Sequence, residues 1–158
     1  MSNLRMKTPL DIEADPNDPD IIDIGWMRIV TSPYARFFWE GCKVRELRIP
    51  KCTACGNLWF YPTPRCTKCL APAGHWIVAS GEATLYSYTT LHRPLHKDLE
   101  PQLPYIVGVV QLAEGVRMMT NIEGAPEAQL ETDMPVRVDY REVKTGAVLP
   151  VFRPLPGR

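Results

Sequence analysis

The residues best suited to chemistry are four cysteines that form two Cys-x-x-Cys pairs, Cys52/Cys55 and Cys66/Cys69. Each pair makes a tight turn that can place two sulfurs on one ion, so the two turns supply the four soft ligands of a tetrahedral metal. One pair alone could equally be a redox dithiol. Two pairs, joined by a short segment rich in aromatic residues and proline, predict a zinc ribbon or its iron-binding rubredoxin-like relative.

We expect this site to be structural, with zinc as the expected ion and iron less favoured. Four cysteines fill the coordination sphere, so no position is left for a water molecule. The remaining cysteine, Cys42, is interpreted as a buried helix thiol, because no base can be assigned to it. The sequence has no Gly-rich phosphate loop and no HExxH pattern, and its histidines suggest no nucleophile–base pair. No catalytic residue is therefore assigned to this chain, and whether it is an enzyme stays open.

Chain length and composition limit the elements that can position these cysteines. The 158 residues are 45% hydrophobic, enough for a packed core, while 16 prolines argue against long helices. We therefore expect a mainly β fold with short N-terminal helices. Its predicted parts are an acidic N-terminal arm at 1–30, short helices at 31–49, a zinc ribbon at 50–76 and an OB-fold barrel at 77–158.

The N-terminal arm is acidic, with six acidic and two basic residues in positions 1–25. It is predicted to be either a solvated, mobile tail or an arm that becomes ordered on a partner. The first ten residues have no apolar core of the signal-peptide type, and no run is long enough to span a bilayer. We therefore expect a cytoplasmic protein without membrane contact, whose thiols stay reduced.

Two short helices are predicted before the ribbon, as a helical hairpin. Thr31-Ser32-Pro33 suits a helix start and Gly41 its end, with aromatic residues on one face between them. A second helix is expected from Cys42 to about Arg48. The aromatic side chains either pack against the neighbouring domains or face a partner.

The remainder of the chain reads as five strands joined by turns. The predicted strands are Ala83–Leu91, Tyr105–Leu112, Val116–Ile122, Val136–Arg141 and Ala147–Phe152. Five strands in this short span, with a longer connection before the fourth, predict a small Greek-key barrel of the OB type. Within the first of these strands, Tyr86 and Tyr88 are expected to share a face.

The charge distribution bears on nucleic acid as a partner. The chain balances 18 basic against 18 acidic residues, and positions 77–158 hold eight basic and ten acidic ones. Positions 36–68 are more basic, which either offsets the thiolate charge or forms a modest phosphate-attracting patch. Because Tyr86 and Tyr88 could stack on bases, a nucleic-acid-binding module remains the alternative function, although the charge balance counts against it.

Taken together, these motifs resemble a known family. Phe38-Trp39-Glu40-Gly41 precedes the cysteine pairs, the barrel starts with the segment from Ser80 to Tyr88, and the chain closes with Leu149-Pro150-Val151-Phe152-Arg153-Pro154. This order is similar to the OB-fold and zinc-ribbon family catalogued as domain of unknown function thirty-five. The resemblance covers roughly residues 33–154. It departs from the family at Thr67 and Leu70, where proline and glycine are common, so the second cysteine turn is expected to be less regular.

The resemblance implies a small subunit that supports a thiolase-like catalytic partner acting on acyl-CoA. Family partners include acetyl-CoA acetyltransferases, sterol side-chain aldolases, phloroglucinol acyltransferases and benzoylsuccinyl-CoA thiolases. In such complexes the partner carries the catalytic cysteine, and the small subunit binds beside it through its helices and ribbon. A free-standing acyl-CoA-binding protein is a further alternative. The sequence names neither the acyl group nor the subunit stoichiometry.

The loop after the first barrel strand reads His92-Arg93-Pro94-Leu95-His96-Lys97. It is either a solvated surface loop or, given the resemblance, a coenzyme A contact. In the second interpretation Arg93 and Lys97 meet the phosphates, while His92 lies at the mouth of the acyl-CoA site.

Overall fold

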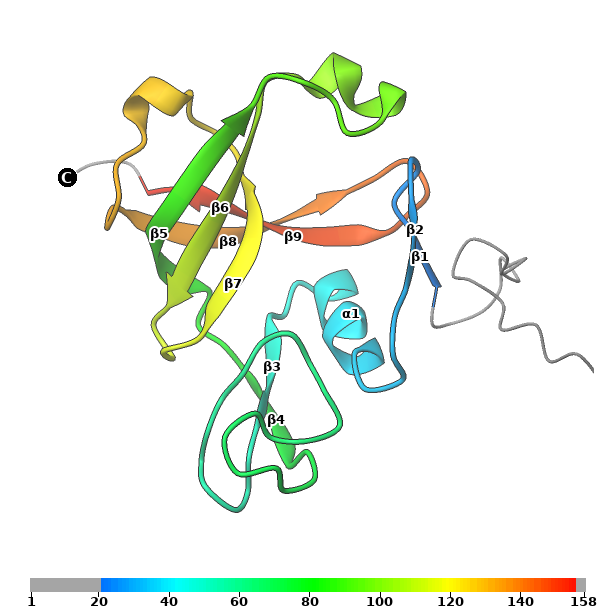
Figure 1. Ribbon diagram of the computed structural model, residues 1–158, viewed down its shortest axis with the longest axis vertical. Coiled ribbons are helices and arrows are strands. Elements are labelled where there is room, and N and C mark those ends of the chain that lie inside the picture. Colours follow the sequence, from blue (N-terminus) through cyan, green and yellow to red (C-terminus); the bar gives the residue numbers. More distant parts are fainter. Residues whose placement is uncertain (1–20, 156–158) are drawn as a thin grey trace, which may run out of the picture.

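The computed structural model describes residues 21–155 as nine strands, one α-helix and two short 3-10 helices. Figure 1 shows a barrel with a smaller ribbon projecting from it and the helix α1 packed between them. The elements are β1 (Ile21–Asp23), β2 (Arg28–Val30), α1 (Arg36–Lys43), β3 (Arg48–Lys51), β4 (His75–Val78), β5 (Glu82–Leu91), η1 (Lys97–Gln102), β6 (Tyr105–Leu112), β7 (Arg117–Ile122), η2 (Glu127–Gln129), β8 (Pro135–Glu142) and β9 (Val148–Pro154).

The barrel closes in the order β5-β6-β7-β9-β8, with β8 returning to β5. All pairs are antiparallel except β7 and β9, which run parallel through Asn121–Val151 and Ile122–Phe152. Closure leaves the barrel without a free edge strand, and its interior is filled by alternate side chains. The five predicted strands and the OB-type barrel are therefore confirmed.

One face assignment within the barrel was wrong. The register between β5 and β6 shifts between Leu85 and Ser87, so the alternation of inward and outward side chains changes there. Tyr88 consequently packs against the core and donates its hydroxyl to the Leu130 carbonyl at 2.8 Å. Tyr86 is exposed instead, with the Arg117 guanidinium 3.6 Å from its ring centre. The two tyrosines therefore do not share a face.

The first predicted helix forms, but later than expected. A turn in which the Ala35 N–H donates to the Ser32 carbonyl at 2.8 Å precedes α1. Gly41 lies inside the helix and not at its end. A Cβ there would stand 2.7 Å from the Glu46 carbonyl, so glycine lets the returning chain approach closely.

The second predicted helix, Cys42 to Arg48, was wrong, and with it the helical hairpin. The chain leaves α1 through a turn in which Arg45 has a φ of 60° and the Glu46 N–H donates to the Gly41 carbonyl at 2.9 Å. It then forms β3, in which Ile49 pairs with Ile77 of β4. Burial of Leu47 and Ile49 in the core and pairing with a strand far along the chain outweigh a weak local helix propensity.

Part of the acidic arm is an ordered hairpin. Strands β1 and β2 pair through Ile21–Val30, Ile22–Ile29 and Asp23–Arg28. The Thr145 hydroxyl, in the β8–β9 turn, donates to the Asp23 carbonyl and ties the hairpin to the barrel. The arm prediction for residues 1–20 lies outside the described residues.

The buried residues form two separate cores. The larger joins the barrel interior to α1 and β3, so Phe38, Leu47 and Ile49 pack in one cluster with Leu85 and Phe152. The smaller consists of Cys52, Trp59 and Cys66, with two partly buried alanines around them. The stem of the ribbon thus belongs to the barrel core, while its tip has almost no apolar core. No helix within residues 21–155 has the length and apolar character needed to cross a bilayer.

Candidate functional site

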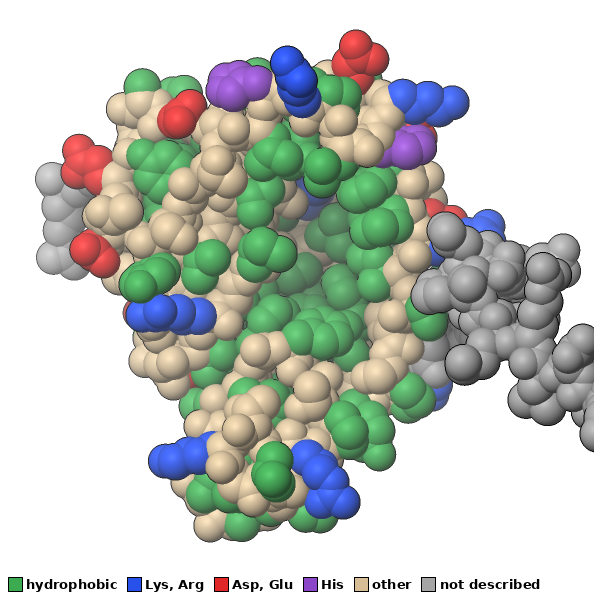
Figure 2. All heavy atoms as spheres, viewed as in Figure 1, with side chains coloured by type: hydrophobic (Ala, Val, Ile, Leu, Met, Phe, Trp, Pro, Cys, Tyr) green, Lys and Arg blue, Asp and Glu red, His purple; other side chains and the backbone are tan. Residues whose placement is uncertain are grey.

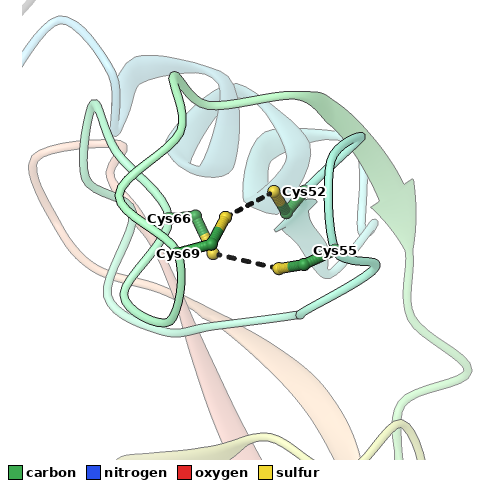
Figure 3. A group of neighbouring side chains, drawn as sticks. All are labelled: Cys52, Cys55, Cys66 and Cys69. Carbon is green, nitrogen blue, oxygen red and sulfur yellow. Dashed lines mark hydrogen bonds between the residues drawn. The ribbon is translucent and has the colours of Figure 1, made fainter.

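The four predicted cysteine ligands come together at the ribbon tip. Their sulfurs all lie within 4.8 Å of one another, with Cys52 Sγ 3.5 Å from Cys69 Sγ and Cys55 Sγ 3.7 Å from Cys66 Sγ (Figure 3). A tetrahedral ion with metal–sulfur bonds of about 2.3 Å requires sulfur–sulfur distances of about 3.8 Å. The donor set and its spacing therefore fit a four-thiolate zinc site.

The two cysteine turns have the same backbone geometry. In the first turn the Cys52 N–H donates to the Asn57 carbonyl at 2.8 Å and the Gly56 N–H to the Cys52 carbonyl at 2.9 Å. In the second turn the Cys66 N–H donates to the Ala71 carbonyl at 2.9 Å, and the Leu70 N–H donates to the Cys66 carbonyl at 3.1 Å. The expectation of a less regular second turn was wrong.

Leu70, which stands in the second cysteine turn where the family commonly has glycine, adds backbone strain but does not change the shape of the turn. Gly56 and Leu70, the fourth residues after the first cysteine of each turn, both have left-handed backbones, with φ of 72° and 61°. A leucine in this conformation is disfavoured by about 1–2 kcal/mol relative to glycine. The metal-binding turn therefore imposes strain on Leu70, whose side chain is 68% exposed.

Hydrogen bonds to sulfur favour the thiolate form that a metal binds. Burial acts to raise the pKa of Cys66, but backbone N–H groups of Cys69 and Lys68 outweigh it and lower the pKa to about 6. The Lys68 N–H lies 3.4 Å from this sulfur, and the Asn57 side-chain amide adds a donor at 3.6 Å. The pKa of Cys52 is also lowered, mainly by the Cys55 backbone N–H. The pKa of Cys55 is raised instead, to about 12, because its Asn57 backbone hydrogen bond is outweighed by the neighbouring Cys69, Cys52 and Cys66 sulfurs and by burial. Backbone donors thus favour the thiolate at Cys52 and Cys66, whereas Cys55 holds its proton until a metal binds.

Cys42 is separate from this quartet and is buried on α1. Burial raises the pKa of its thiol to about 12, despite a backbone hydrogen bond and the Arg48 charge, which act to lower it. A thiol that stays protonated and covered is not a nucleophile at neutral pH. Its predicted role as a buried helix thiol agrees with this geometry.

The predicted coenzyme A contacts lie on the exposed loop between β5 and β6. His92 and Arg93 follow β5, and Lys97 begins η1, all three with exposed side chains. His96 is partly covered, because its ring stacks on Trp26 of the N-terminal hairpin with centroids 6.2 Å apart. Its Nδ1 also accepts from the Asp98 N–H at 3.3 Å. The side chains of Arg93 and Lys97 are therefore exposed to solvent, and both lie close in sequence to His96, which contacts the hairpin.

A cavity of about 670 Å³, which the sequence reading missed, lies beneath this contact. Figure 2 shows it as a hollow with a largely apolar lining on the face of the molecule toward the viewer. Its walls come from the hairpin, η1, β6, β7 and the ends of β8 and β9. The signal available in the sequence is the group of apolar residues between Ile21 and Val30, which the acidic character of the N-terminal segment outweighs in a prediction based on composition.

A second exposed apolar surface flanks α1 and the ribbon. Tyr34, Phe37 and Tyr61 are each exposed by 39% or more. Tyr61 packs edge-on against Phe38 and accepts a 2.8 Å hydrogen bond from Trp39 Nε1, whereas the Phe37 ring contacts Trp76 with centroids 5.3 Å apart. Of the aromatic residues of α1, Phe38 packs in the core, as one of the two alternatives predicted, while Phe37 is partly exposed. That the exposed rings face a partner stays a prediction.

Comparison with known proteins gives two matching domain families. The model described as the rubredoxin-like zinc ribbon domain of ChsH2 matches residues 39–73, and that of the C-terminal OB-fold domain of ChsH2 matches residues 76–141. These matches cover the ribbon and most of the barrel. Neither includes the hairpin at residues 21–30.

Curated relatives are of two kinds. A protein of Thermomonospora curvata described as "Probable enoyl-CoA hydratase alpha subunit" is 39% identical over 75% of this chain, and a Mycobacterium tuberculosis protein described as 3-oxo-4,17-pregnadiene-20-carboxyl-CoA hydratase alpha subunit is 36% identical over 80%. The chain spans only 36% and 38% of the length of these two proteins. A DUF35 domain-containing scaffold protein of Methanocaldococcus jannaschii is 30% identical over 67% of this chain and 76% of that protein.

Among solved structures, a chain of the assembly described as Ltp2-ChsH2(DUF35) aldolase is similar with a TM-score of 0.70 and 37% sequence identity. The match covers 78% of this chain and 95% of that one. A protein of unknown function from the DUF35 family of Sulfolobus solfataricus shares the fold, with a TM-score of 0.53 and 16% identity.

Proposed function

The chain belongs to the DUF35 family of paired zinc-ribbon and OB-fold domains, and from this premise we propose that it is a non-catalytic subunit of an enzyme complex acting on acyl-CoA. The observation that carries the proposal is its likeness, at 37% identity, to nearly the whole of one chain of the Ltp2-ChsH2(DUF35) aldolase. A scaffold role also fits the names of the archaeal relatives.

The chemistry of the cysteine residues supports a non-catalytic role for this chain. Its four tip cysteines form a complete ligand set, so zinc bound there has no position for substrate or activated water. Cys42 is buried with a raised pKa and is not available as a nucleophile. In this proposal the zinc fixes the shape of the tip, and the catalytic groups belong to the partner.

The finer proposal is that the partner has a thiolase-type fold and forms or cleaves a carbon–carbon bond, as the benzoylsuccinyl-CoA thiolases do. The family resemblance and the aldolase named in the related assembly support it. Exposed aromatic residues beside α1, Tyr34, Phe37 and Tyr61, offer a surface for such a partner. Aromatic side chains half-covered in the free chain lose little mobility on docking.

The test is to purify the chain and a thiolase-like partner separately and to measure acyl-CoA turnover alone and together. We expect no activity from this chain, little from the partner, and full activity from the mixture. Replacing Phe37 and Tyr61 with serine should prevent co-elution, while Tyr86→Ser, at an exposed ring on β5 of the barrel, serves as the control. Full activity of the partner by itself would overturn the proposal.

A hydratase is the second candidate partner, because two relatives are described as hydratase alpha subunits. The two candidates differ in chemistry, since a hydratase adds water to an unsaturated acyl-CoA and releases no shorter thioester. Assays of co-purified complexes therefore separate them by product. Conversion of an enoyl-CoA to a 3-hydroxyacyl-CoA supports the hydratase, whereas release of a shorter acyl-CoA, from a 3-hydroxyacyl-CoA or from a 3-oxoacyl-CoA with free coenzyme A, supports the carbon–carbon bond-cleaving partner. Binding of acyl-CoA to this chain without any partner, measured by calorimetry, would support the free-standing alternative.

We further propose that Arg93 and Lys97 contact coenzyme A phosphates and that His92 lies beside them. The support is their exposure on one loop, and within residues 21–155 no carboxylate lies at ion-pair distance from Arg93 or Lys97. The Arg93→Ala, Lys97→Ala double variant should raise the KM of the complex for acyl-CoA about tenfold, as expected for lost charge-assisted bonds. Lys144→Ala, in the β8–β9 turn, is the control, and an unchanged KM would refute the assignment.

A further inference from the structure

The cavity of about 670 Å³ between the hairpin and the barrel is a binding feature that the scaffold role leaves unused. Ile24, Trp26 and Met27 of the hairpin form one side, and Leu99, Ile106 and Ile122 belong to the opposite walls. This volume lies within the range of about 300–1,000 Å³ that is usual for small-molecule sites. An apolar body of drug-like size therefore fits between the hairpin and the barrel.

The turn of the hairpin is held against the barrel by two contacts. The Thr145 hydroxyl donates to the Asp23 carbonyl, and the Trp26 ring stacks on His96 with centroids 6.2 Å apart. Residues 21–30 lie outside both matched domain families. The cavity is therefore made by a segment that the shared ribbon and barrel do not supply.

Two polar donors at the cavity lack acceptors. Tyr105 and Arg141 both line it, and the Tyr105 hydroxyl and Arg141 Nε are buried without a hydrogen-bond partner among the described residues. A buried donor left unpaired costs about 1–3 kcal/mol, so an oxygen-bearing ligand gains by satisfying it. Arg141 Nη1 is already 2.8 Å from Glu123 Oε1, which balances its charge. The geometry thus favours a neutral oxygen over a carboxylate.

We infer that this cavity binds the bulky apolar body of a ligand that carries a neutral oxygen acceptor, such as a ketone or a hydroxyl group. Given the proposed function, on which this identification rests, the ligand is the acyl part of the thioester. Leu95 and Leu99, which line the cavity, flank Lys97 on the same loop. The cavity thereby selects for large, oxygenated acyl groups over short ones.

The first test uses the full chain and free probes without coenzyme A. We expect the rigid polycyclic ketone androst-4-ene-3,17-dione to bind in calorimetry, and decanoate, a flexible carboxylate, to bind at least tenfold more weakly. Ala125→Trp should abolish ketone binding, because Ala125 lines the cavity and the indole would fill it. A thermal melt verifies that this variant is folded. No binding of the ketone, tighter binding of decanoate, or unchanged binding by folded Ala125→Trp overturns the inference.

The second test addresses the oxygen contact. Tyr105→Phe removes a hydroxyl that has no partner in the described chain, so it should leave the fold unchanged while raising the ketone Kd about fivefold to tenfold. Tyr86→Phe, on the barrel surface outside the cavity, is the matched control and should change nothing. Equal Kd values for Tyr105→Phe and the wild-type chain would refute the hydroxyl contact. Because no partner or coenzyme A is present, these outcomes are independent of the complex-forming experiment.

Discussion

The ribbon tip and the barrel are stabilised by different physics. The tip buries only Cys52, Trp59 and Cys66 as its own cluster and depends on four sulfurs brought within 4.8 Å. The barrel is closed by strand pairing around a continuous apolar core that includes Leu85 and Phe152. Metal ligation is a short-range effect of a few residues, whereas barrel stability is spread over many contacts.

The metal-dependent part of the chain is smaller than the zinc-ribbon domain, because the stem of the ribbon belongs to the barrel core. Leu47 and Ile49, on or beside β3 of the ribbon stem, are buried in the barrel cluster, as is Phe38 of α1. Only the segment beyond the stem relies on metal. The stem can therefore hold the tip at a fixed orientation to the barrel, which is what a scaffold facing a partner requires.

Removing the metal should have the largest effect on stability, and it should affect the ribbon tip but not the barrel. Chelation or Cys66→Ser should unfold the tip, because four-cysteine zinc sites contribute about 10–16 kcal/mol of apparent binding free energy. Hydrogen exchange should show lost protection at residues 52–57 and 63–73 and retained protection in β5–β9. Cys42→Ser, which leaves the ligands intact, is the control. Global loss of protection, or a Cys52→Ser chain that keeps its metal and its fold, would break the distinction.

A cavity in the barrel core should have the next largest effect. Phe152 is fully buried, so Phe152→Ala should lower the free energy of unfolding by about 3–5 kcal/mol in denaturant titration. Phe37→Ala, at a ring that is 41% exposed, should cost much less. Metal affinity of the folded Phe152→Ala chain should be unchanged. A parallel drop in metal affinity would show that the tip depends on the barrel core.

A smaller gain is expected from relieving strain in the second cysteine turn. Leu70→Gly should stabilise the metal-bound tip by about 1 kcal/mol, because the left-handed backbone at Leu70 suits glycine and its side chain buries little. Competition with a chelator measures the change. The converse variant, Gly56→Leu, should weaken metal retention by a similar amount. If Leu70→Gly weakened retention, the side chain would have a packing role that outweighs the strain.

The smallest effect at neutral pH concerns Cys42. Its pKa of about 12 in the folded chain exceeds the ordinary value near 9. The unfolded thiol therefore loses its proton first, and stability should fall as pH rises from about 9 toward 12. Cys42→Ala should make the loss of stability over this window less steep than in the wild type, measured by thermal melts. At pH 8 the native thiol should resist iodoacetamide, and rapid alkylation would contradict its burial.

Much of the site and the barrel was predictable from sequence because the determinants are local. The spacing of Cys52, Cys55, Cys66 and Cys69 by itself defines two metal-binding turns. Alternating or continuous apolar residues between turn signals marked all five barrel strands, and the combined motifs correctly indicated the family. Each of these signals is carried by residues that are near one another in the chain.

What only the tertiary structure decided depends on contacts between distant residues. Local propensity favoured a helix up to Arg48, but pairing of Ile49 with Ile77 made that segment a strand. A register shift at Leu85/Ser87, set by the partner strand, turned Tyr88 inward. The cavity exists because Trp26 meets His96 across seventy residues of sequence, a distance over which no local pattern constrains packing. The sequence determined the metal ligands, while tertiary packing decided which surfaces the metal-bound tip holds in place.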